Sequence, residues 1–98
     1  MEIECRFFGP FREAVDEDRV LLTVDVDTYS ELFVLLENRY PGLSGRLLDD
    51  DGGFAGSTVV TRNGTDLRHL DGLDTPVREG DVVRAIPSVY GGCAARRN

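Results

Sequence analysis

Two stretches near the start of the chain alternate between apolar and polar residues. Residues 2–8 and 20–26 both show this period of two, which is typical of a β-strand that buries one face. Gly9 and Pro10 stop the first stretch, and residues 11–15 are expected to form a short helical turn. We predict that the two strands pair in antiparallel fashion. The apolar positions expected in the core are Ile3, Cys5, Phe7, Val20, Leu22, Val24 and Val26.

A helical period follows and predicts the main helix of the chain. Thr28 is a favourable N-cap residue, and Glu31 three residues later gives a capping box. Pro41 and Gly42 end the pattern, because proline cannot continue the hydrogen-bond ladder of a helix. The apolar residues at helical spacing, which we expect to face the core, are Leu32, Leu35, Leu36 and Tyr40.

The second half of the chain predicts turns and two further strands. Residues 49–57 form a loop of aspartates and glycines around Phe54, and residues 59–62 form a short strand. Asn63-Gly64 is a strong hairpin signal, because a type I′ turn needs positive φ at both positions. The last strand covers residues 82–86. Three leucines, Leu43, Leu47 and Leu48, are expected to pack beneath a second short helical piece.

The predicted order of elements is β-β-α-β-(short β)-β. A helical crossover of this length commonly places two strands parallel, here the first and the last, and it covers one face of the sheet. The sequence therefore predicts an α+β roll of the β-grasp type, with a mixed sheet of four to five strands and one main helix on one face. We expect a single domain over residues 1–90, followed by a flexible tail over residues 91–98.

The composition limits the classes of partner. The chain has 98 residues, of which 41% are hydrophobic, so a modest single core is expected. Its net charge of −7 argues against sequence-independent binding of nucleic acids, which requires a cationic surface. The sequence shows no apolar run of membrane-spanning length and no secretory signal, so we expect a cytoplasmic protein without membrane contact.

All eleven basic residues are arginine, and lysine is absent. An acidic surface without lysine suggests adaptation to high salt. We predict that the midpoint of thermal unfolding rises between low and molar salt, because salt screens the repulsion among the eighteen acidic side chains. Calorimetry across a salt series would measure this, and a midpoint that stays constant would contradict the prediction.

No residues form a recognisable catalytic or metal site. Cys5 is expected in the core, Cys93 is expected to be a free thiol in the tail, and their spacing fits no metal motif. His69 is the single histidine, which excludes a His-based triad, and we expect it at the surface. Residues 49–51 are acidic, but no glutamate follows at the spacing of a calcium loop, so a solvated loop is expected. We therefore expect no metal and no cofactor.

The strongest candidate for a reactive segment is the pair Gly91-Gly92, which follows the last predicted strand. Glycine has no Cβ, so such a pair can enter a narrow channel and adopt backbone angles that other residues avoid. A diglycine that ends a chain presents its α-carboxylate as a reagent, but here residues 93–98 follow it. The alternative interpretation is an ordinary flexible glycine pair.

Five segments of the sequence together suggest a family. They are Phe7-Phe8-Gly9-Pro10-Phe11-Arg12-Glu13-Ala14, Tyr40-Pro41-Gly42-Leu43, Asn63-Gly64, residues 73–83, and Pro87 to Gly92. In this order the series resembles the small sulfur-carrier and ubiquitin-like proteins. That family includes the small subunit of molybdopterin synthase, the thiazole-synthesis sulfur carrier and the archaeal small ubiquitin-like modifiers. The resemblance covers nearly the whole chain.

The resemblance implies a role for Gly92. Once terminal, its carboxylate would be adenylated by an ATP-dependent activating enzyme, with Val89 and Tyr90 in contact with that enzyme. The activated carbonyl would then accept sulfur to give a thiocarboxylate, or pass to an amine of a target protein. A processing protease would first have to remove residues 93–98. The protein would thus be a carried reagent and not an enzyme, with target proteins or a sulfur-accepting synthase subunit as its final partners.

Two positions depart from the family pattern: Ser88 replaces a proline of the closing motif, and Tyr90 places a bulky ring beside the diglycine. Because a cleavable tail controls the time of activation, the modifier role is slightly favoured over sulfur transfer. The alternative from another class is a non-covalent interaction module that keeps its tail. Phe8 and Phe54 are the candidate partner-binding residues, although Phe54 alternatively covers the core.

Overall fold

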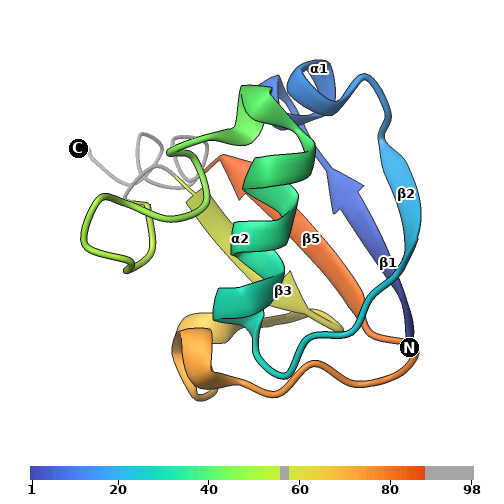
Figure 1. Ribbon diagram of the computed structural model, residues 1–98, viewed down its shortest axis with the longest axis vertical. Helices are drawn as coiled ribbons and strands as arrows, with labels where there is room; N and C mark the ends of the chain where they lie inside the picture. Colours follow the sequence, from blue (N-terminus) through green and yellow to red (C-terminus); the bar gives the residue numbers. More distant parts are fainter. Residues whose placement is uncertain (56–57, 88–98) are drawn as a thin grey trace.

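A mixed five-stranded sheet with a helix across one of its faces makes up the fold (Figure 1). The computed structural model describes residues 1–55 and 58–87. The strands are β1 (Glu2–Phe7), β2 (Arg19–Thr23), β3 (Thr58–Arg62), β4 (Thr65–Asp66) and β5 (Val82–Pro87). The helices are α1 (Pro10–Val15) and α2 (Tyr29–Arg39), with 3-10 turns η1 (Pro41–Leu43), η2 (Leu67–His69) and η3 (Gly72–Asp74).

The strand order is β2-β1-β5-β3-β4, so β5, the last strand among the described residues, lies at the centre of the sheet. It runs parallel to β1, and the remaining neighbours pair in antiparallel fashion. This arrangement confirms the β-grasp roll and the parallel pairing of the first and last strands. The hairpin at Asn63 and Gly64 is also confirmed, with φ values of 52° and 91°.

The second strand is shorter than predicted. β2 ends at Thr23, and the prediction of a strand as far as residue 26 is wrong. Val24 is still buried and donates its N–H to the carbonyl of Met1, but Val26 is only partly buried. The chain leaves the sheet here because the next residues connect to another segment: the carbonyl of Asp27 accepts the N–H of Val77.

Helix α2 begins as its sequence predicts. The hydroxyl of Thr28 accepts the N–H of Glu31 at 3.4 Å. The Glu31 carboxylate in turn accepts the N–H of Asp27 at 3.0 Å, one residue before the N-cap. The helix ends at Arg39, with Tyr40 as its C-cap residue. The following helical piece is limited to η1, whose last residue Leu43 is buried as predicted, as are Leu47 and Leu48 after it.

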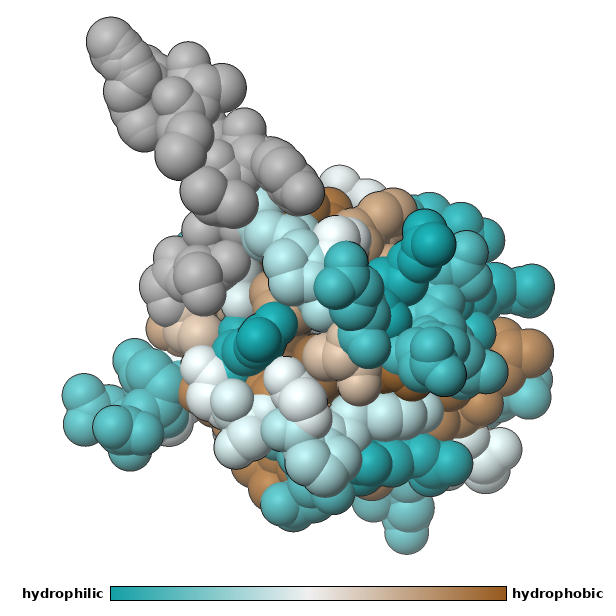
Figure 2. Space-filling model, turned by 90° about the horizontal axis from the view of Figure 1, so that it is seen from above, coloured by the Kyte–Doolittle hydropathy of each residue, from teal (hydrophilic) through white to brown (hydrophobic). Residues whose placement is uncertain are grey.

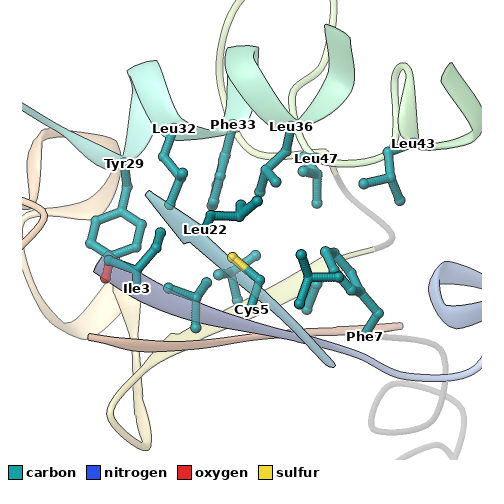
Figure 3. Packing of buried hydrophobic residues seen from close by; sticks show 14 of the residues in the cluster. Ile3, Cys5, Phe7, Leu22, Tyr29, Leu32, Phe33, Leu36, Leu43 and Leu47 are labelled. Carbon is teal, nitrogen blue, oxygen red and sulfur yellow. The ribbon is translucent and has the colours of Figure 1, made fainter. Parts of the chain in front are cut away.

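The side of α2 that faces the sheet differs in part from the predicted stripe. Leu32 and Leu36 are buried as expected, but Leu35 and Tyr40 are only partly buried. Tyr29 and Phe33, which the prediction omitted, complete the buried set at positions i, i+3, i+4 and i+7. Figure 3 shows these helix residues pointing toward Ile3, Cys5 and Phe7 of β1.

Gly42 marks a close approach between η1 and α1. A Cβ at this position would lie 2.8 Å from the Cβ of Ala14 and 3.3 Å from its carbonyl oxygen. We predict that Gly42→Ala lowers the free energy of unfolding by about 1–3 kcal/mol, the usual cost of overpacking. Urea unfolding would measure the loss. Gly53→Ala is the matched control, because its nearest contact would be an ordinary 3.6 Å to Asp49. A double variant that adds Ala14→Gly should recover part of the loss, and equal stability of Gly42→Ala and wild type would contradict the packing argument.

Candidate functional site

The residues predicted to carry the chemistry follow β5 directly. Gly91 and Gly92, the flanking Val89 and Tyr90, and Cys93 all lie outside the described residues, as does the predicted domain boundary. The structure does define the platform that precedes them. β5 ends at Pro87, which is buried and lies opposite Thr58 of β3. The chain therefore passes to residue 88 from the central strand of the sheet.

The start of β5 is fixed by a buried carboxylate, Asp81, which is 3% exposed. It accepts hydrogen bonds from the Tyr29 hydroxyl at 2.8 Å and from Arg62 Nε at 3.0 Å. It also accepts from Asn63 Nδ2 at 3.2 Å and from the backbone N–H of Arg78 at 3.0 Å. We call these five residues the Asp81 cluster. The cluster joins the first turn of α2, the β3–β4 hairpin and the entry to β5.

The environment of Asp81 favours its charged form. Burial alone would raise the pKa of this carboxyl, but the Arg78 N–H, the Arg62 guanidinium and the hydrogen bonds from Tyr29 and Asn63 outweigh it. The pKa of Asp81 therefore lies below its ordinary value. Burial, followed by the hydrogen bond to Asp81, raises the pKa of Tyr29, so this phenol remains a hydrogen-bond donor. The sequence analysis did not predict this cluster, because its members are far apart along the chain.

We call the sheet face that points away from α2 the outer face. Along each long strand, the side chains on this face alternate with the buried core residues. Glu4 and Arg6 of β1 lie on it, and Phe8 follows immediately after the strand. Phe8 is 40% exposed, and its N–H donates to the carbonyl of Ala85 in β5. The ring of Phe8, a candidate partner-binding residue, is thus exposed beside the end of β5, and its role in partner binding stays a prediction.

Phe54 occupies a different setting. Its ring meets that of Phe33 edge to face at 6.3 Å, and the guanidinium of Arg68 lies 4.5 Å from its centroid. The Arg68 side chain also donates to the carbonyl of Thr58 at 3.3 Å. Phe54 therefore covers one end of the core, which was one of its two predicted roles. Its role in partner binding stays a prediction.

The cysteine and histidine in the described part of the chain are not arranged for catalysis. Cys5 is buried, and this burial, with a further contribution from the charge of Glu4, raises the pKa of its thiol to about 12. His69 is exposed at the end of η2, as predicted. Among residues 1–55 and 58–87, no three His, Cys, Asp or Glu side chains are placed to hold a metal ion. Within the same residues, no helix has the length and hydropathy needed to cross a bilayer.

The surface seen from above is largely hydrophilic, with smaller hydrophobic areas between the charged side chains (Figure 2). The features of the described part that lie nearest to the predicted reactive tail are the end of β5 and the outer face beside it.

The chain is similar to known proteins in both sequence and structure. The sequence model of the ThiS family matches residues 5–92. Small archaeal modifier protein 3 from Haloferax volcanii is 42% identical over 93 residues, which cover 94% of this chain and the relative's full length (100%). A putative sulfur carrier protein from Archaeoglobus fulgidus is 33% identical over 72% of this chain and 83% of the relative. The solution structure of the Haloferax volcanii HVO 2177 protein is 41% identical and covers 94% of this chain and 87% of that protein, with a TM-score of 0.82.

Proposed function

We propose, because this chain belongs to the ThiS family of ubiquitin-like sulfur carriers and small modifiers, that it acts through the carboxylate of Gly92. In this proposal the protein is a modifier that is made as a precursor, and residues 93–98 are removed before Gly92 reacts. The protein is then a substrate that an ATP-dependent enzyme activates, and the catalytic groups lie in that enzyme.

The observation that carries this proposal is where the family match ends. The ThiS model matches through Gly92 itself, and residues 93–98 lie beyond it. The modifier relative is aligned over its full length (100%), and this alignment covers 94% of this chain. The fold is consistent with this proposal, because the described chain ends in β5, the central strand of the sheet, which has neighbours on both sides. A rigid platform of this kind can present a short tail to a partner.

The proposed chemistry explains why a partner and ATP are needed. An ionised carboxylate is a poor electrophile, because expulsion of an oxide from its carbonyl is unfavourable. Transfer of AMP from ATP to Gly92 releases pyrophosphate and gives a mixed anhydride with AMP as leaving group. An amine of a target protein then attacks the carbonyl and AMP departs. Attack by hydrosulfide (HS⁻) on the same carbonyl would instead expel AMP and give the thiocarboxylate.

The modifier role is favoured over sulfur transfer by the comparisons. The relative named as a modifier shares 42% of aligned residues over 94% of this chain, whereas the relative named as a putative sulfur carrier shares 33% over 72%. Val89 and Tyr90 are proposed to contact the activating enzyme as they precede the diglycine. Phe8 is the exposed aromatic beside the end of β5, while Phe54 could contribute only the part of its ring not packed against Phe33 and Arg68.

The test uses the sequence around the diglycine. Proteins isolated from the native cells are digested with a protease that cuts after tyrosine, since cleavage after Tyr90 leaves Gly91-Gly92 on each modified lysine. Diglycine-bearing lysines that disappear when the gene is deleted would support the modifier role. A free protein ending at Gly92 and heavier by the exchange of one oxygen for sulfur would support the carrier role. Only the full chain, without either product, would contradict both and favour the non-covalent module.

A further inference from the structure

Three arginines lie side by side across the outer face of the sheet. Arg6 of β1 is paired in register with Arg19 of β2 on one side and with Arg84 of β5 on the other. We call Arg19, Arg6 and Arg84 the arginine row. Like charges placed directly opposite one another on neighbouring strands destabilise a sheet. The row is positively charged, whereas the chain as a whole carries a net charge of −7.

A single acidic side chain, Glu4, organises two of these arginines. Its carboxylate accepts from Arg6 Nε at 2.5 Å and lies 3.3 Å from Arg19 Nε. The hydrogen bond from Arg6 holds the pKa of Glu4 below its usual value. Because both contacts use Nε, the outer nitrogens of the two guanidinium groups remain available, on side chains that are 42% and 56% exposed. Arg84 makes no ion pair with any described residue.

Two members of the row, Arg6 and Arg19, line a hollow at the end of the sheet from which the chain continues to residue 88. This hollow has a volume of about 230 Å³, and its walls include Arg6, Arg19, Arg12 and Phe8. Asp18 is the one acidic residue that lines it. Guanidinium groups next to an exposed aromatic ring are a composition typical of protein interfaces. Figure 1 shows α1, which contributes Arg12, near the same end of the sheet as the tip of β5.

We infer that the arginine row is a docking site for carboxylate side chains of the protein that takes up the tail. Guanidinium groups held in a fixed orientation bind carboxylates with two hydrogen bonds, and the contacts with Glu4 supply part of that orientation in advance. An acidic partner is repelled by most of this acidic chain and attracted at the row, which orients the complex. The inference rests on the proposed function in that it names the partner as the activating enzyme.

An acidic protein fits this surface better than a nucleic acid. Nucleic acids are bound through many phosphate contacts over an extended cationic surface, whereas here the row is short, Glu4 lies beside it and the chain as a whole is acidic. A folded partner that presents a few carboxylates can bind through the local positive charge of the arginine row. Binding should therefore weaken as salt is added, while the apolar contact with Phe8 is retained.

The first measurement is activation kinetics. The chain ending at Gly92 is offered to the adenylating enzyme purified from the same cells, and ATP–pyrophosphate exchange is followed. We expect Arg84→Glu to raise the KM for the protein at least about tenfold, with little change in kcat. The matched control is Arg39→Glu, which makes the same charge change at the exposed end of α2, on the other side of the sheet. Arg19→Glu, on the edge strand, repeats the test should Arg84→Glu fail to fold. Equal KM values for row and control variants overturn the inference and leave the proposed function intact.

The second measurement does not depend on activation. Arginine side-chain N–H signals are followed by NMR while hexaglutamate, hexalysine or an oligothymidylate of matched charge is added. Saturable shifts at the arginine row with hexaglutamate, absent in Arg84→Glu, support the inference even if no adenylation of Gly92 is found. Tighter binding of the oligothymidylate at the same signals, or no shift with hexaglutamate, overturns it.

Discussion

The chain shortened to end at Gly92 is expected to be adenylated, whereas the full-length chain is expected to give no product. In the full-length chain the carbonyl of Gly92 is part of a peptide bond to Cys93, so it has no carboxylate oxygen to attack ATP. Removal of residues 93–98 creates that nucleophile without changing any described residue of the domain. ATP–pyrophosphate exchange with the activating enzyme measures the difference directly.

Two further chains test whether position matters as well as charge. A chain that ends at Gly91 also has a terminal carboxylate, but its reactive group lies one residue, about 3.5 Å, short of the same place. Because small displacements of reacting atoms are costly, we expect its kcat/KM to fall at least about 100-fold. A chain with Gly92→Ala keeps the length and tests the need for a residue without Cβ. Equal activity of the full-length chain and the Gly92-ended chain would contradict the precursor proposal.

The sequence predicted most of the fold because its signals are local. The alternation in β1, the capping residues Thr28 and Glu31, and the Asn63-Gly64 turn each depend on neighbours within a few positions. The rotation of α2 was harder to predict. A stripe that contains Leu35 and one that contains Phe33 both satisfy helical spacing, and the choice is made by packing against the sheet.

The Asp81 cluster could not be predicted in the same way. Its members come from positions 29, 62, 63, 78 and 81, and each has an unremarkable local interpretation as helix start, strand, turn or loop. They meet because the parallel pairing of β1 and β5 places the start of β5 beneath the first turn of α2. The arginine row likewise depends on register, since an arginine in one strand says nothing about the residue opposite it.

Loss of the Asp81 carboxylate is expected to destabilise the domain strongly. Asp81→Asn keeps the shape but replaces one carboxylate oxygen with an N–H donor, which would then face donors from Arg62, Asn63 or the Arg78 backbone. We expect the free energy of unfolding to fall by about 3 kcal/mol, in the range found when one member of a buried charged cluster is removed. That is a large part of the about 5–15 kcal/mol by which a domain is stable. Urea unfolding at neutral pH measures it. Tyr29→Phe, which removes one donor, should cost about 1 kcal/mol, and Asp50→Asn is the exposed control.

Asp81 also makes the free energy of unfolding depend on pH. The pKa of Asp81 is lower in the folded protein than its ordinary value of 3.8, so the unfolded chain takes up the proton first. Its contribution to stability is therefore complete above that ordinary value and is lost progressively as the pH falls below it, through the folded-state pKa. The stability difference between wild type and Asp81→Asn should be constant near neutral pH and shrink in strong acid. Since the variant cannot titrate at this position, a difference that persists unchanged in strong acid would show that the cluster stabilises the fold by shape and not by charge.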